Sequence, residues 1–502
     1  MVPVTSQRRA GIFLGYANII VKNLVNLVYT PMLLSFVSQA EYGVYQTSNS
    51  FVLTLTLLSF GFSGAYIRFF TQRRAKGEDV AKLNGVYLVL YTTISVAALL
   101  LGLAFATSAN TLFSASFTPD EANLAQTVMS IMAGSVAITL FNTVFDAYIL
   151  AHEQFRFQQS RQLFTTVAMP FCAYALLCAG FGVTGVAIAQ LMVSAVLVAL
   201  NAGFCLGKLK MRFDVRHFDS RLFKAIFIFS IWLFVNQICD LVNQSVPNIL
   251  LGAFSGASAV AVFAIAVQIR MIFYSLSTIM SSVFTPKINQ IVAASDSNSV
   301  LSCLMTRVGR YQMVLFCWVY GGFAILGRFF IRAWAGEGFA DAYWLVLAMV
   351  APLVIPLTQN TGIEIQRARN MHKPRSIAML VGAALNVAIT IVAAPLLGYW
   401  APAVGYIVCI ALCNGAFMNW YYQRRVGLDM FHFWRRNLPV LLTGAAVTAV
   451  CLAGATAFPV SGWLAFFAWG VAYTVLFAIA LWFAVLTKDE RAAVKSRLPF
   501  LG

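Results

Sequence analysis

The sequence predicts an all-α polytopic membrane protein with fourteen transmembrane helices, and three observations lead to this prediction. Of the 502 residues, 60% are hydrophobic and only 10% are charged, and a soluble protein of this composition would lack a polar surface. Apolar stretches of about 20 residues, the length of a helix that spans a bilayer, recur along the whole chain. Basic residues gather between alternate apolar stretches, as they do in membrane proteins with a fixed orientation.

Hydropathy windows of about 20 residues place the expected helices in chain order. Arg8 and Arg9 precede the first apolar stretch, which has no small-residue cleavage site, so we expect a retained helix and not a signal peptide. The loops that remain are too short for a soluble catalytic domain, and the chain is not expected to be an enzyme. The expected helices lie near residues 10–36, 45–71, 85–108, 122–150, 162–180, 184–206, 225–250, 258–286, 311–332, 343–365, 376–397, 403–422, 438–457 and 463–485.

The distribution of positive charge predicts the orientation of these helices. If the N-terminus is cytoplasmic, Arg328 and Arg332 are the only basic residues near the outer face. Three more lie within expected helices, and all the others of the 34 Lys and Arg residues fall in cytoplasmic segments. The positive-inside rule then places both termini in the cytoplasm. The net charge of +17 is explained by attraction to anionic inner-leaflet lipid, so no nucleic-acid partner is expected.

An internal repeat with an offset of 218 residues relates the two halves of the chain. "NTVFD" at 142–146 matches "NTGIE" at 360–364, and "GFGVTGVA" at 180–187 matches "GYWAPAVG" at 398–405. Such a repeat predicts two six-helix lobes of equal orientation that rock about a central site. We therefore expect an N-lobe at 10–206 (helices one to six), a basic cytoplasmic linker at 207–224, a C-lobe at 225–422 (helices seven to twelve) and two further helices at 438–485.

Polar stripes interrupt two of the apolar helices at positions that the same offset relates. Because lipid cannot satisfy polar groups, each stripe is expected to face a cavity or another helix. The stripe in the helix at 10–36 consists of Asn18, Lys22, Asn26 and Tyr29. The stripe in the helix at 225–250 consists of Asn236, Asp240, Asn243 and Gln244.

The charged residues within the helices leave two interpretations open. Lys22 pairs with Asp240, its counterpart in the repeat, or it receives an anionic substrate group in a central cavity; a switch between the two would accommodate both. Arg270 has no acidic residue within reach on its own helix, which favours a functional role. Arg68 lies near a helix end, where a basic side chain can reach the interface without any function.

Two further acidic residues, Asp146 and Glu364, are related by the offset of 218. They lie near expected cytoplasmic helix ends, where Arg156 and Arg367 are available as ion-pair partners. The alternative is that they couple transport to an ion. Asp240 is the first candidate for such coupling, and whether the ion is H⁺ or Na⁺ stays open. Neither a CxxC pair nor a histidine cluster indicates a metal site, and no cofactor is expected.

The fourteen helices, the repeat, the cation in the first helix and the segment "EYGVYQTSNSF" at 41–51 resemble the polysaccharide-transport flippases. These belong to the multidrug/oligosaccharidyl-lipid/polysaccharide exporter superfamily. The resemblance covers roughly residues 10–485, although "FVSQAEYG" stands where the family usually has a Leu-Gly pair. It implies a bacterial inner-membrane protein that moves a polyprenyl-diphosphate-linked oligosaccharide to the outer leaflet for O-antigen, capsule or another surface glycan. A polysaccharide polymerase and other assembly proteins are the implied partners, besides membrane lipid.

The resemblance also implies which residues bind substrate. Lys22, Arg68 and Arg270 lie on the helices that carry the cavity cations of lipid II flippases, and Asn18, Asn26, Tyr29 and Gln244 suit the sugars. One alternative is a multidrug or cation antiporter of the same superfamily, for which an acidic cavity would be expected. A glycosyl polymerase or ligase would need a larger outer loop than "SANTLFSASFTPDEAN".

Overall fold

The computed structural model describes residues 4–215 and 245–486 except 283, 370 and 372, together with residues 223–228, 230, 234, 237, 238, 241 and 491. All regular secondary structure in these residues is helical. Eleven helices in this part of the chain are long and apolar enough to cross a membrane, and each falls on one of the expected helices. The architecture is that of a polytopic membrane protein.

Three of the expected helices are not among these eleven. The stretches 10–36 and 162–180 are helical, as α1 (Val4–Phe36) and α7 (Phe155–Cys178). The stretch 225–250 lies largely outside the described residues. The total of fourteen membrane-spanning helices therefore stays a prediction.

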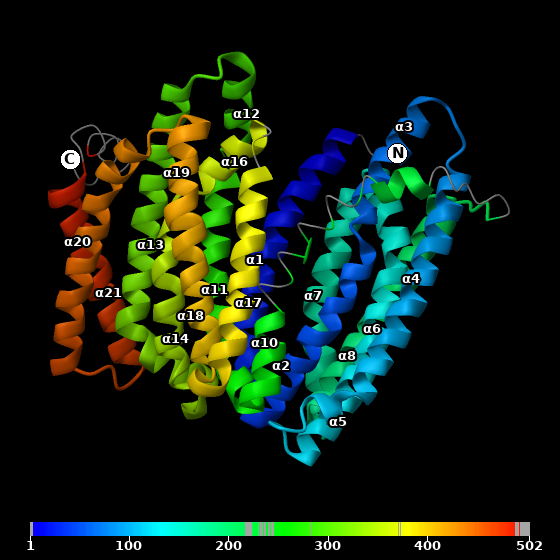
Figure 1. Ribbon diagram of the computed structural model, residues 1–502, viewed down its shortest axis with the longest axis horizontal. Coiled ribbons are helices and arrows are strands. Elements are labelled where there is room, and N and C mark those ends of the chain that lie inside the picture. The colour runs from blue at the N-terminus through cyan, green and yellow to red at the C-terminus, as the bar shows by residue number, and fades with distance from the viewer. Residues whose placement is uncertain are drawn as a thin grey trace. The chain divides into compact units, whose positions relative to one another are not determined.

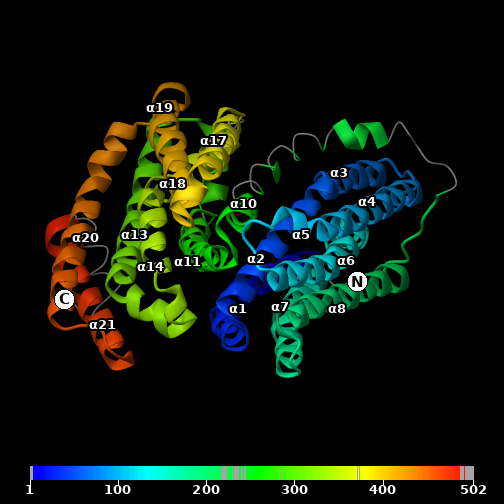
Figure 2. The ribbon, with the colours of Figure 1, turned by 60° about the horizontal axis from the view of Figure 1, so that its bottom comes forward.

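The chain divides into two compact units, the first of which comprises Met1–Ala261 and Ala394–Tyr399. In this unit α6 packs against α4, α8, α2 and α3 (Figures 1 and 2). Buried tyrosines join these helices, since the hydroxyl of Tyr66 donates to Asn84 Oδ1 (2.6 Å) and that of Tyr87 donates to the carbonyl of Phe62 (2.9 Å). Besides α1 and α7, its elements are α2 (Gln39–Thr54), η1 (Leu55–Ser59), α3 (Phe62–Ala75), α4 (Ala81–Thr107), α5 (Ala109–Leu112), α6 (Pro119–Ala151), α8 (Gly182–Gly203), η2 (Phe204–Lys208) and α10 (Val246–Ser255).

The second unit comprises Val262–Ala393 and Trp400–Gly502. Its long helix α13 packs against α20 and α21 (Figure 2), and a cluster of buried side chains that includes Met305, Tyr422 and Phe433 fills one end of the unit. The start of α11 (Ala257–Ser282) and the end of α17 (Lys373–Leu397) belong to the first unit, and the rest of both helices lies in the second. Its other elements are α12 (Thr285–Ala294), α13 (Asn298–Ala335), η3 (Glu337–Phe339), α14 (Ala342–Val350), η4 (Ala351–Leu353), α15 (Val354–Thr358), α16 (Asn360–Ala368), α18 (Trp400–Cys409), η5 (Ile410–Met418), α19 (Asn419–Tyr421), η6 (Tyr422–Val426), α20 (Met430–Ala457), α21 (Trp463–Ala480) and η7 (Leu481–Val485).

The expected helix at 343–365 is broken into short pieces, α14, η4, α15 and α16. Pro352 and Pro356 lie within this stretch, and proline lacks the N–H group that the regular helix needs, so it kinks or breaks the helix. The break leaves backbone carbonyl groups that other side chains of the unit can bond.

Several element boundaries recur 218 residues apart, as the repeat requires. α8 begins at Gly182 and its π-helical continuation η2 ends at Lys208; α18 begins at Trp400 and the π-helical η6 ends at Val426. The turns before these helices contain Gly180 and Gly398, both with positive φ (85° and 51°), a conformation that glycine adopts at little cost. Superposition of the six-helix lobes and the lobe boundaries themselves stay predictions.

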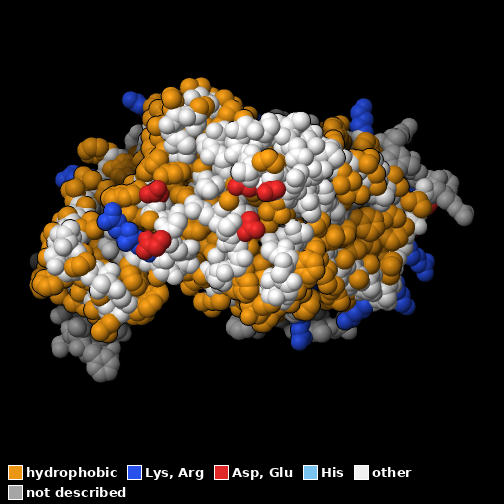
Figure 3. Space-filling view, turned by 90° about the horizontal axis from the view of Figure 1, so that it is seen from below, with side chains coloured by type: hydrophobic (Ala, Val, Ile, Leu, Met, Phe, Trp, Pro, Cys, Tyr) orange, Lys and Arg blue, Asp and Glu red, His pale blue; other side chains and the backbone are white. Residues whose placement is uncertain are grey.

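Many large hydrophobic side chains are exposed among the described residues. Hydrophobic side chains cover broad areas in a view from below, with few charged side chains between them (Figure 3). On α21, Leu464 is 87% exposed and Phe467 64% exposed. A soluble protein does not usually expose apolar surface on this scale, so the exposed areas fit contact with lipid.

Candidate functional site

Arg270 on α11 is the most unusual charged residue of the second unit. It is only 4% exposed, and no described Asp or Glu forms an ion pair with it. Its guanidinium carbon lies 4.1 Å from the ring centroid of Tyr406 on α18. Nη1 donates to the sulfur of Met349 on α14 at 3.9 Å, while Nε has no hydrogen-bond partner among the described residues. A guanidinium with so few acceptors is a candidate anion site.

Helical spacing explains how α11 presents this arginine. Arg270, Tyr274 and Ser277 recur at four and three residues and therefore lie on one face of the helix. The hydroxyl of Tyr274 contacts that of Tyr406 at 3.1 Å. Two tyrosines, one from each of two helices, are thus joined beside the guanidinium.

Ser277 connects the same face of α11 to the broken helix. Its hydroxyl donates to the carbonyl of Leu357 (2.6 Å), a bond that the interruption after α15 permits, and it accepts from Gln312 Nε2 (3.2 Å) and Asn360 Nδ2 (2.8 Å). Gln312 is 2% exposed and its Oε1 has no partner in the described residues. The network holds α11, α13 and α16 together beside the arginine site.

The polar stripe of α1 divides between two environments. Asn18 is buried and its Nδ2 donates to the carbonyl (2.9 Å) and to Oε1 (2.8 Å) of Gln159 on α7. Tyr29 is half-buried, with no hydrogen-bond partner for its hydroxyl in the described residues. Lys22 and Asn26 are exposed. Asn18 therefore joins two helices, and the exposed pair remains the candidate substrate surface of α1.

Three further residues of the predicted site are exposed or lie outside the described residues. Arg68 is exposed on α3. Asp240 and Gln244 lie outside the described residues, so the pairing of Lys22 with Asp240 stays a prediction, as does a sugar contact for Gln244.

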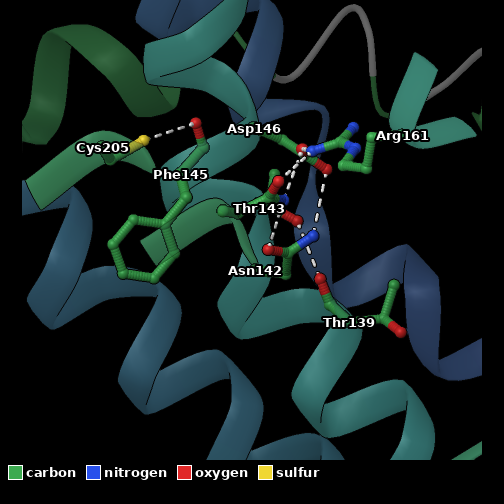
Figure 4. A network of polar contacts seen from close by, with 8 residues as sticks. Thr139, Asn142, Thr143, Phe145, Asp146, Arg161 and Cys205 are labelled. Atoms are coloured by element: carbon green, nitrogen blue, oxygen red, sulfur yellow. Dashed lines mark hydrogen bonds and ion pairs between the residues drawn. The ribbon is translucent and has the colours of Figure 1, made fainter. Parts of the chain in front are cut away.

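Asp146 belongs to a polar network that joins α6, α7 and α8 in the first unit. Asp146 forms an ion pair with Arg161, which also donates to Asn201 Oδ1 at 2.6 Å (Figure 4). Asn201 Nδ2 in turn donates to Asn142 Oδ1 (2.7 Å) and Asp146 Oδ1 (3.0 Å). The expected partner was Arg156, which is exposed; Arg161 replaces it because its side chain reaches the interior between the three helices. These contacts indicate that the network stabilises the packing of α6, α7 and α8.

Glu364, the repeat counterpart of Asp146, has a different environment. Arg367 on the same helix donates to its Oε1 at 2.7 Å, as expected from the sequence, and Thr285 approaches Oε2 at 3.5 Å. The Arg367 side chain is 62% exposed, so this pair is screened by solvent and contributes little to stability. Of the two acidic residues, Glu364 is the less constrained.

Sequence reasoning missed the partners of the buried charges. Tyr406 and Met349 contact Arg270, and Tyr274 contacts Tyr406, yet nothing in their local sequence distinguishes them from core residues. Asn201 carried a usable signal, because residue 419, at the offset of 218, is also asparagine. Among the described residues, no group of three or more His, Cys, Asp or Glu could hold a metal ion.

Comparison with known proteins identifies relatives over most of the chain. The profile of the family described as "Polysaccharide biosynthesis protein" matches residues 9–292. The uncharacterized membrane protein EpsK of Bacillus subtilis (strain 168) is 25% identical over 479 residues, which are 93% of this chain and 93% of EpsK.

Two solved structures share the fold. The lipid II flippase MurJ in an inward closed conformation aligns with a TM-score of 0.72 and 13% identity, over 93% of this chain and 98% of MurJ. An inward-facing multidrug resistance MATE family transporter of the MOP superfamily aligns with a TM-score of 0.68 and 14% identity, over 82% of this chain and 96% of the transporter. At these identities the likeness concerns the fold alone.

Proposed function

This chain belongs to the polysaccharide biosynthesis protein family, and we propose that it is a flippase for a polyprenyl-diphosphate-linked oligosaccharide. It would carry this lipid from the cytoplasmic to the outer leaflet of the bacterial inner membrane by alternating access, for the assembly of a surface polysaccharide. A polysaccharide polymerase and other assembly proteins would receive the product.

The buried guanidinium of Arg270 is the observation that carries this proposal. A charged side chain inside a membrane protein is costly and usually has a function, and removing a buried cation from water without a counter-ion is more costly still. A diphosphate offers several charged oxygens that a guanidinium can bind in a bidentate manner. In a lipid-linked oligosaccharide the diphosphate joins the polyprenyl chain to the sugar. Arg270 therefore suits the diphosphate, and the exposed amide of Asn26 suits the sugar.

The charge of this site argues against the multidrug alternative. A cationic drug would meet a buried cation beside the tyrosine pair, and no described carboxylate neutralises it. Like charges in a low-dielectric environment repel strongly. Fold similarity to a multidrug transporter does not outweigh this, because one fold hosts many functions.

The transport cycle that we propose uses the predicted topology. Fourteen helices with both termini in the cytoplasm would form two six-helix lobes. Lys22, Arg68 and Arg270 are the candidate cations for the diphosphate. In the emptied carrier Lys22 would return to Asp240. Asp240, Asp146 and Glu364 remain the candidates for coupling to H⁺ or Na⁺.

An export assay tests the proposal through Arg270. In a strain that lacks this protein, Arg270→Gln should abolish surface glycan and leave lipid-linked oligosaccharide in the inner leaflet, because the diphosphate loses its buried cation. Arg332→Gln is the matched control, since Arg332 pairs with Glu337 (3.2 Å) and is 51% exposed; it should export normally. Normal surface glycan in an Arg270→Gln strain with wild-type protein levels would refute the role of Arg270.

A further inference from the structure

We infer that Tyr406 holds Arg270 in the empty carrier and gives it up to the diphosphate when substrate loads, so that Tyr406 is a positioning residue for transport. This inference rests on the proposed function. No sequence motif indicates Tyr406. Its ring contacts the guanidinium of Arg270 in the empty carrier, and the substrate anion contacts the same group after loading.

The first step is that the buried guanidinium has few hydrogen-bond acceptors among the described residues. Arginine has five N–H donors and no acceptor. Within the part of the chain that the structure describes, the Arg270 group has a thioether sulfur at 3.9 Å as its hydrogen-bond acceptor, and its Nε has none. The guanidinium carbon lies over the face of Tyr406, 4.1 Å from the ring centroid. A cation–π contact stabilises a desolvated cation, but by less than hydrogen bonds to an anion do.

The second step is that the ring is fixed in place and does not merely lie nearby. Tyr406 is 7% exposed, and its hydroxyl contacts that of Tyr274 at 3.1 Å. Tyr274 lies one turn beyond Arg270 on α11, whereas Tyr406 belongs to α18. The contact between the hydroxyl groups therefore sets the ring that α18 supplies against the guanidinium that α11 supplies.

The third step concerns substrate loading. With only 4% of Arg270 exposed, a diphosphate cannot bond it until the guanidinium leaves the ring. The cost of this departure lowers the apparent affinity for substrate, as it does whenever the competent state is a minor one. The ring thus protects an otherwise unpaired charge and also keeps the anion from binding so tightly that it cannot be released.

Binding of farnesyl diphosphate to the purified full-length protein in detergent measures this cost. Tyr406→Leu removes the ring and should bind about tenfold more tightly, since a desolvated cation–π contact corresponds to roughly a tenfold change in equilibrium or more. Tyr406→Phe retains the ring but loses the hydroxyl that contacts Tyr274, so it should bind only roughly two- to threefold more tightly than wild type. Tyr274→Phe loses the contact between the hydroxyls and should bind roughly two- to threefold more tightly, so it also serves if Tyr406→Leu does not fold.

A double-mutant cycle separates this role from a structural one. In an Arg270→Gln background, Tyr406→Leu and Tyr274→Phe should no longer change the affinity, because the cation that they release is absent. Unchanged or weaker binding by both tyrosine variants, while the wild type binds through Arg270, would overturn the inference and leave the proposed function intact. Equal binding by wild type and Arg270→Gln would overturn both.

Discussion

Two buried arginines illustrate how this chain treats charge in its interior. Arg161 is 10% exposed and bonds Asp146 and Asn201, so its charge is neutralised within the first unit. Arg270 is buried to a similar degree and has an aromatic ring and a sulfur instead. The difference fits the proposal that Arg161 stabilises the fold whereas Arg270 binds the substrate anion.

Arg161→Gln should therefore destabilise the protein, because it leaves Asp146 and Asn201 without their shared donor. We expect the free energy of unfolding to fall by about 2 kcal/mol, the value of a hydrogen bond to a charged group, with partial solvent access of Asp146 limiting the loss. Thermal unfolding of the purified protein measures this. Arg156→Gln, which alters an exposed residue of the same helix, should unfold like wild type. Equal melting temperatures for the two variants would contradict a stabilising role for the Asp146–Arg161–Asn201 network.

Lys22 is a second candidate cation for the proposed binding of the diphosphate. Lys22→Ala should abolish glycan export at normal protein levels, because the anion loses a cation in a low-dielectric site. Lys22→Arg should retain part of the activity, since it keeps the charge but changes the donor geometry. Lys76→Ala, an exposed control at the end of α3, should export normally. Full export by Lys22→Ala would remove Lys22 from the site.

Sequence reasoning reached Arg270 but not its partners, and the reason is physical. A charge in an apolar helix is conspicuous because of its desolvation cost, whereas Tyr406 and Met349 are ordinary residues of buried helices. Their role arises only when α11, α14 and α18 pack together. Arg161 was missed for the same reason, since Arg156 is nearer to Asp146 in sequence and only the packing of α7 brings Arg161 to the carboxylate.

At the scale of elements, close packing explains the glycine in the segment at 41–51. A Cβ on Gly43 of α2 would lie 1.8 Å from the carbonyl oxygen of Ala257, at the start of α11. The backbones therefore meet where only glycine fits. About two helix turns further along α2, Asn248 Nδ2 on α10 donates to Ser50 Oγ at 2.9 Å, which joins α2 to α10.

Gly43→Ala should force these segments apart and lower the free energy of unfolding by about 1–3 kcal/mol, as overpacking in a tight core does. Thermal unfolding measures the effect. Gly207→Ala is the matched control, because a Cβ there meets nothing within 4 Å. A Gly43→Ala protein as stable as this control would show that the contact is not tight.

Element positions were largely predictable because hydropathy fixes the length of a membrane helix. The interruptions were not, since they depend on local chemistry within apolar stretches. Pro352 and Pro356 break the expected helix at 343–365, and Ser277 bonds the carbonyl of Leu357 at the break. The π-helical turn at 422–426 likewise has no signature in a hydropathy window.

At the scale of the whole molecule, charge asymmetry predicts the topology. Reporter fusions after residues 115 and 500 should report opposite sides of the membrane, because the positive-inside rule places residue 115 outside and the C-terminus inside. Activity of a periplasmic reporter at 115 and of a cytoplasmic reporter at 500 is the expected pattern. Both fusions on one side would contradict the fourteen-helix topology and the direction of transport that depends on it.

Translocation by the purified protein tests the central proposal most directly. Proteoliposomes would contain the full-length chain and a labelled polyprenyl-diphosphate oligosaccharide, whose exposure at the opposite leaflet is measured by an impermeant sugar-modifying enzyme. Wild type should make the inner-leaflet fraction accessible, and Arg270→Gln should not, while Arg332→Gln should match wild type. Labelled lipid that crosses no faster with wild type than with Arg270→Gln or in protein-free vesicles would contradict the assignment of this chain as a flippase for lipid-linked oligosaccharide.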